Sequence, residues 1–110
     1  MITFITPNPQ QLLTSLKEAI RKGHISTWSE ENGYFTHTPS QWARKAWLRA
    51  SVQNSELRFA IINSQGSYVT TEVYAVYHGR FIETMLAHFD KQFNNGFASA
   101  MPTAADQVAA

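Results

Sequence analysis

The sequence predicts an α+β domain in which two helices, one N-terminal and one long and C-terminal, pack on one face of a four-stranded antiparallel meander. Amphipathic helical patterns stand near both ends of the chain, and short strand-like segments lie between them. The connections between these segments are too short for parallel crossovers. With 110 residues, 44% of them hydrophobic, the chain has room for one core. We therefore expect a single domain over residues 1–95 with the order α-β-β-β-β-α.

The first helix is expected to begin at Pro9, after a short extended start at residues 2–5. Asn8 is a typical N-cap, proline suits the first helical position, and Gln11 completes a capping box. Gly23 is predicted to end the helix, because glycine commonly follows the last helical turn. The apolar residues between these limits have helical spacing: Leu12, Leu13, Leu16, Ala19 and Ile20.

A hairpin at residues 25–38 is the strongest local signal, since the Asn32-Gly33 pair suits the two positive φ angles of a type I′ turn. A two-residue turn places four residues on the face expected to point to the core: Trp28, Glu30, Phe35 and His37. A brief helical turn over residues 42–45 is predicted to lead into two further strands, at residues 46–52 and 56–63.

Residues 71–93 are predicted to form one long amphipathic helix. Its apolar stripe has steps of three and four residues and comprises Tyr74, His78, Phe81, Met85 and Phe89. A strand as far as Tyr77 is the alternative, since the residues before it are rich in β-branched and aromatic types. Residues 96–110 are rich in alanine and lack a period, so we expect a disordered tail whose removal leaves the fold intact.

Composition narrows the classes of function. A net charge of +1 argues against nucleic-acid binding driven by bulk charge. Charged residues make up only 15% of the chain and aromatic residues 13%, so we expect aromatic surface to be covered by a protein partner or a second copy, as in a homodimer. The absence of cysteine excludes disulfides and thiolate chemistry. No signal peptide or membrane span is recognised, so a cytoplasmic location is expected.

A candidate ligand pocket is placed between the predicted sheet and the final helix, with the lining residues Trp28, His37, Tyr74 and His78. A buried histidine beside a tyrosine can act as a general acid or base. The favoured interpretation of His78 is nevertheless a core residue hydrogen-bonded to a carbonyl or a tyrosine hydroxyl. Glu30 is a candidate partner for His37, although an exposed position beside the turn is favoured.

A basic segment interleaved with aromatic residues is the candidate nucleic-acid surface and comprises Trp42, Arg44, Lys45, Trp47 and Arg49. Tryptophans anchored in the core, with solvated charges at a sheet edge, are the favoured interpretation because the net charge is near zero. The histidines lack the spacing of a metal clamp, and no phosphate-binding or hydrolase motif occurs. We predict no catalytic residue, no metal and no cofactor.

The sequence therefore favours a small non-enzymatic interaction module that binds a protein partner or itself. A ligand-binding or hydrolytic domain with the pocket described above is the second hypothesis. Single-stranded nucleic-acid binding through residues 42–49 is the third.

Overall fold

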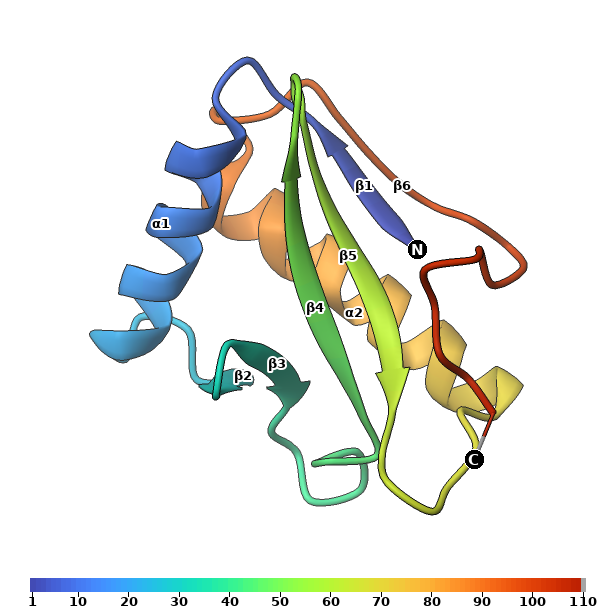
Figure 1. Ribbon diagram of the computed structural model, residues 1–110. Coiled ribbons are helices and arrows are strands. Elements are labelled where there is room, and N and C mark those ends of the chain that lie inside the picture. Colours follow the sequence, from blue (N-terminus) through green and yellow to red (C-terminus); the bar gives the residue numbers. More distant parts are fainter. Residues whose placement is uncertain (110) are drawn as a thin grey trace.

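The computed structural model describes residues 1–109, and this part of the chain folds into six strands and two helices (Figure 1). The elements are β1 (Ile2–Ile5), α1 (Pro9–Arg21), β2 (Trp28–Glu31), β3 (Tyr34–His37), β4 (Ala46–Gln53), β5 (Glu56–Asn63), α2 (Thr71–Phe89) and β6 (Asn95–Ala98). The strands form one antiparallel sheet in the order β2-β3-β4-β5-β1-β6. The predicted α+β class and the meander from β2 to β5 are confirmed. The sheet is larger than predicted, because β1 and β6 extend it.

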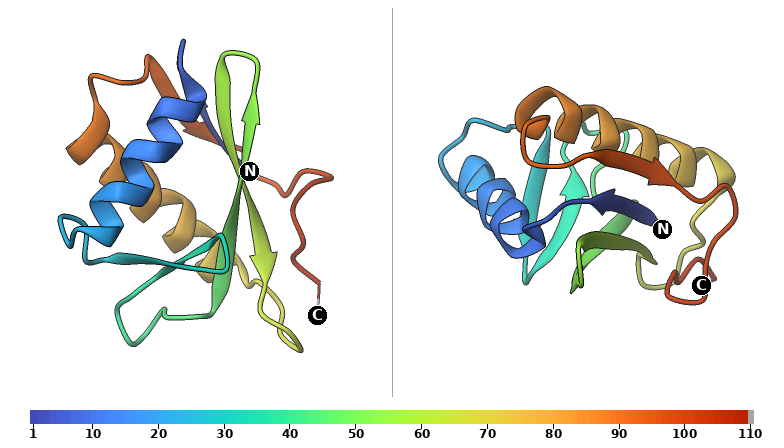
Figure 2. Two further views of the ribbon diagram at one scale, coloured as in Figure 1. Left: turned by 60° about the vertical axis from the view of Figure 1, so that its left-hand side comes forward. Right: turned by 90° about the horizontal axis from the view of Figure 1, so that it is seen from above.

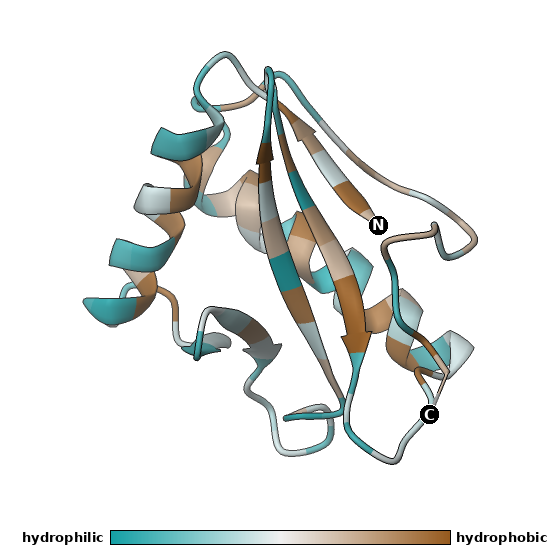
Figure 3. Ribbon diagram, viewed as in Figure 1, coloured by the Kyte–Doolittle hydropathy of each residue, from teal (hydrophilic) through white to brown (hydrophobic). Residues whose placement is uncertain are grey.

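Both helices lie on one face of the sheet, as predicted, and the segment after β6 runs along the opposite side (Figure 2). We call the face covered by the helices the inner face and the opposite face the outer face. Hydrophobic and hydrophilic residues alternate along β4 and β5 (Figure 3), as expected for strands with one face packed against a core. The alternation decides which side chains remain available for contacts with other molecules.

The core lies between the inner face and the two helices. Its centre is a cluster of aromatic rings, in which Phe81 of α2 lies 4.6 Å from Phe59 of β5 and 5.0 Å from Trp28 of β2, measured between ring centroids. Rings that meet edge to face pack more favourably than their buried area alone implies. Other large side chains in the described residues that are completely covered are Ile2, Phe4, Leu12, Leu16, Phe35, Leu48, Leu57, Ile61, Tyr77 and Met85.

The predicted helix beginnings agree with the structure. The Asn8 side chain accepts a hydrogen bond from the Gln11 backbone N–H at 3.2 Å, and Pro9 is the first helical residue. Residues 71–77 are helical, so the alternative of a strand to Tyr77 is wrong. The second helix ends at Phe89 and not at residue 93, because the chain turns there and Phe93 packs against Phe4, with ring centroids 5.0 Å apart.

The predicted hairpin is also confirmed. Asn32 and Gly33 have φ angles of 54° and 84°, and Trp28 stands opposite His37 in the ladder. This register directs Trp28, Phe35 and His37 into the core, where all three are buried.

Replacing Gly33 with valine is expected to lower the free energy of unfolding by about 1 kcal/mol or more, because a β-branched residue is strained at positive φ. Urea denaturation of the two proteins measures the difference. Asparagine tolerates the left-handed region, so Gly33→Asn is the matched control and should lose less. Equal midpoints for Gly33→Val and the parent would show that the turn does not constrain the fold.

The prediction of a disordered tail over residues 96–110 does not agree with the structure of its described part. Strand β6 pairs with β1, so that Ala98 stands opposite Ile2. Further on, the Gln107 N–H donates to the Ile61 carbonyl at 2.8 Å, and the Asn63 N–H donates to the Gln107 carbonyl at 2.7 Å. Gln107 thus fills the position beside β5 that β1 leaves open. Such pairing has no local period and escapes pattern recognition. Residue 110 lies outside the described residues.

Candidate functional site

The four residues of the predicted ligand pocket form two separate stacks. Trp28 stacks on His37 with ring centroids 4.5 Å apart, and Tyr74 stacks on His78 with centroids 3.8 Å apart. The first stack joins β2 and β3, whereas the second lies on α2 and faces the amino group of Met1. The structure therefore does not join the four side chains into one shared lining as predicted.

The polar atoms of the first stack are paired within the protein. The Trp28 indole N–H donates to the Thr84 hydroxyl at 3.1 Å, and His37 Nδ1 donates to the Thr27 carbonyl at 2.6 Å. Nε2 of His37 faces an Arg80 guanidinium nitrogen at 3.4 Å. Burial lowers the pKa of His37 and Arg80 adds to this effect, while the Thr27 carbonyl opposes it. These contacts are those of a core-stabilising pair.

Glu30 does not serve as the partner of His37. Its carboxylate lies 3.5 Å from the ammonium of Lys17 on α1, and both side chains are partly exposed. The Glu30 position beside the turn favours this contact, because the carboxylate stays in water while α1 supplies a cation. The alternative of an exposed Glu30 describes the structure better than a buried pair.

The second stack belongs to a polar cluster that joins α2 to β1 and to the segment after β6. The amino group of Met1 lies 3.0 Å from His78 Nε2, 3.0 Å from an Asp106 carboxylate oxygen, 3.1 Å from the Tyr74 hydroxyl and 3.3 Å from the Ser99 hydroxyl. His78 Nδ1 donates to the Tyr74 carbonyl at 2.7 Å. Since a carbonyl only accepts, His78 carries its proton on Nδ1, and Nε2 accepts from Met1.

Burial and neighbouring groups shift the pKa values of three residues in this cluster. Burial, with the nearby positive charge of Met1, lowers the pKa of His78 from 6.5 to about 4. Burial opposes ionisation of Asp106, but hydrogen bonds from the Thr103 and Ile61 N–H groups and from Met1 outweigh it and lower the pKa of the carboxyl. Burial raises the pKa of Tyr74. His78 is therefore a neutral acceptor whose Nε2 is already engaged, which agrees with a structural role.

The basic and aromatic segment splits into two parts. Trp42, Arg44 and Lys45 belong to the turn before β4 and line a cavity of about 560 Å³ beside the start of α2. Trp42 packs partly against the core, and Arg44 pairs with Glu31 at 3.0 Å. Glu72 lines the same cavity and reduces its positive charge. This part of the candidate nucleic-acid surface is largely neutralised.

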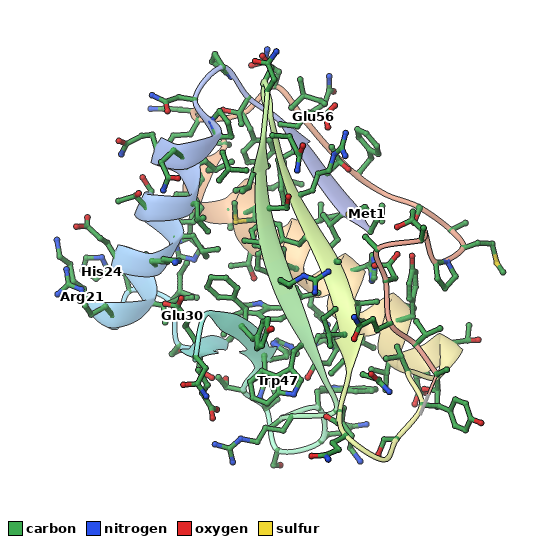
Figure 4. The ribbon with its side chains drawn as sticks, in the orientation of Figure 1. Met1, Arg21, His24, Glu30, Trp47 and Glu56 are labelled. Carbon is green, nitrogen blue, oxygen red and sulfur yellow. The ribbon has the colours of Figure 1, made fainter. Side chains whose placement is uncertain are left out.

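Trp47 and Arg49 project from β4 on the outer face, and Figure 4 shows Trp47 at the lower part of the sheet. Arg49 stands between Tyr34 of β3 and Ala60 of β5 in the ladder, and Trp47 stands beside Ile62. We call these five residues the outer-face patch. The Tyr34 side chain is 40% exposed. Tyr34, Ala60 and Ile62 were not predicted as site residues, although the hairpin register placed Tyr34 on the face away from the core.

Within residues 1–109, no three histidine or acidic side chains gather closely enough to hold a metal ion. None of the helices in this part of the chain combines the length and apolarity needed to cross a membrane.

Comparison of the chain with protein-family models, with curated proteins and with solved structures found no match.

Proposed function

We propose that the protein is a small non-enzymatic binding module whose outer-face patch docks a protein partner. The observation that carries this proposal is the cluster of Tyr34, Trp47 and Arg49 on a sheet face that the helices leave uncovered. Tryptophan, tyrosine and arginine are the residue types that contribute most to the energy of protein interfaces. The proposal also agrees with the low charge and high aromatic content of the chain.

The sheet supports the patch as a rigid platform. Neighbouring strands lie about 4.8 Å apart, and alternate residues on a strand about 6.6 Å apart, so the rings and the guanidinium form one continuous surface. Tyr34 and Arg49 are cross-strand partners, and Trp47 precedes Arg49 by two residues on β4. The sheet already fixes the backbone under these side chains, so binding orders only the side chains themselves, which lowers the entropic cost of association relative to a flexible loop.

Charge favours a protein partner over a nucleic acid. Two arginines near the patch already have acidic partners, since Arg44 pairs with Glu31 and Arg58 with Glu56. A phosphate backbone requires several free cations along its path. Single-stranded nucleic-acid binding is the second candidate function, supported by Trp47 and Arg49, which lie two residues apart on β4 and are both partly exposed on the outer face.

Trp47→Ala is expected to weaken capture of the partner from a lysate of the source organism by about 2 kcal/mol, or roughly thirtyfold, if the patch is the interface. The parent and the variant are compared as immobilised baits, with quantitative mass spectrometry of the retained proteins. Leu86→Ala is the matched control, because Leu86 is 52% exposed on α2, away from the outer face.

The proposal fails if proteins retained by the parent are retained equally by Trp47→Ala, or are lost equally with Leu86→Ala. A second copy of this chain as the occupant would appear as a dimer mass in light scattering that Trp47→Ala reduces to the monomer. Retention of nucleic acid, with affinity falling steeply as salt increases, would favour the second candidate function.

A further inference from the structure

We propose that the hollow between Arg49 and Arg58 on the outer face is an anion site that receives a carboxylate of the docked protein partner. This site rests on the proposed function, because Arg49 belongs both to the hollow and to the outer-face patch. The anion site specifies the partner further: the docked segment carries an acidic side chain and also covers Trp47 and Tyr34.

The hollow has a volume of about 300 Å³, at the lower end of the range for ligand sites. Its lining includes the two arginines, Ser51 and the small side chains Ala60 and Ala105. Among the described residues, no acidic side chain belongs to this lining. The small residues keep the hollow open. Arg49 has no acidic partner within residues 1–109, and Arg58 is paired with Glu56, which lies outside this lining.

Both arginines have donors to offer. Arg49 forms no ion pair within residues 1–109. Arg58 uses its Nε to bind Glu56 at 2.7 Å, and its terminal nitrogens have no hydrogen-bond partner within the same residues. Glu56 lies near the tip of the β4–β5 hairpin (Figure 4) and lines the neighbouring hollow, not this one. A guanidinium has five donors, so one bond to Glu56 leaves Arg58 able to bind a second carboxylate.

Arginine presents paired N–H groups that match the two oxygens of a carboxylate. Arg58 stands opposite Ser51 in the ladder, and Arg49 lies two residues before Ser51 on β4, so the two arginines and Ser51 line one hollow from adjacent strands. The surroundings on the side of Trp47 are aromatic and apolar. This combination suits a single acidic residue in an otherwise apolar segment better than a chain of phosphates.

The C-terminal segment completes the hollow. Ala105 contributes to its wall, and the next residue, Asp106, holds this segment in place through Met1 and through the Ile61 N–H, at 3.0 Å and 2.8 Å. The site is therefore assembled from β4, β5 and residues far away in the sequence.

The experiment is an NMR titration of the isotope-labelled full chain with an acetylated and amidated Gly-Leu-Glu-Leu-Gly peptide, which carries one carboxylate between apolar side chains. The neutral Gly-Leu-Gln-Leu-Gly peptide is the matched probe. We expect the Nε–H signals of Arg49 and Arg58 and the amide signal of Ala60 to shift with the acidic peptide only. Arg49→Gln and Arg58→Gln should each weaken binding about tenfold, whereas Arg21→Gln on the distant α1 (Figure 4) should leave it unchanged.

The anion site is disproved if the two peptides cause equal shifts, or if Arg49→Gln and Arg58→Gln bind the acidic peptide as the parent does. Tighter binding of an oligothymidylate at the same signals would assign the hollow to phosphate and overturn the carboxylate. Failure of the docking proposal gives a different result. In that case Trp47→Ala still retains the captured proteins, and the acidic peptide still shifts the Nε–H signals of the two arginines. Conversely, if capture depends on Trp47 but Arg58→Gln does not weaken it, the docking surface is supported and the anion site is disproved.

Discussion

Removal of residues 96–110 is expected to lower the free energy of unfolding by at least about 4 kcal/mol, or to unfold the protein altogether. The Met1 amino group and the covered Asp106 carboxylate form an ion pair at 3.0 Å, which the truncation removes. The truncation also strips the β1 edge of its partner strand and leaves the Ile61 N–H without its Asp106 acceptor. The whole free energy of unfolding of a domain of this size is only about 5 to 15 kcal/mol.

Urea denaturation followed by tryptophan fluorescence measures the truncated chain against the parent. Met101→Ala is the internal control, because Met101 belongs to the same segment and its side chain is 76% exposed. Asp106→Ala removes the ion pair together with the hydrogen bonds from the Ile61 and Thr103 N–H groups, and should account for most of the loss. An unchanged midpoint for the truncated chain would restore the sequence-based expectation that the fold is complete without this segment.

Acidification from pH 6.5 to pH 4 is expected to destabilise the protein by about 3 kcal/mol through His78. The pKa of His78 is about 4 in the folded state and 6.5 ordinarily, so between these values the unfolded chain binds a proton that the folded chain does not. Each pKa unit corresponds to about 1.4 kcal/mol. Stability therefore rises with pH through this window and is complete above it.

The neighbouring groups act in the same direction. The lowered pKa of His37 adds to the loss as pH falls below its ordinary value. The lowered pKa of Asp106 adds stability that is present above the ordinary value of 3.8 and is lost as pH falls through the folded value. Part of the His78 effect is electrostatic, because protonated His78 would face the Met1 ammonium at 3.0 Å.

Urea denaturation at a series of pH values between 7 and 4 measures this dependence. His78→Gln should flatten the curve, because it removes the titrating group while keeping a polar side chain. His88→Gln is the matched control, since His88 lies exposed on the same helix, and its curve should follow that of the parent. A His78→Gln curve as steep as that of the parent would assign the acid sensitivity to other groups.

The candidate sites were predictable only in part. The hairpin register correctly separated the core residues Trp28 and His37 from Tyr34 on the outer face, because side chains alternate strictly along a strand. The same reasoning could not show that the Tyr74–His78 stack turns to Met1 and Asp106, since residues 1 and 106 approach only in the folded chain. Nor could it show that Arg49 and Arg58 face one hollow, which needs Ala105 as a wall.

Sequence alone determined the features that depend on a few neighbouring residues. The Asn8 cap, the Asn32-Gly33 turn and the meander follow from local backbone preferences and short connections. Only the tertiary structure decided the places of β1 and β6 in the sheet and the docking of Gln107 beside β5. These depend on which strand positions remain unpaired after the meander has formed. They also depend on a close approach at Gly96, where a Cβ would lie 2.9 Å from the Phe4 ring, and such steric complementarity between distant segments has no local sequence pattern.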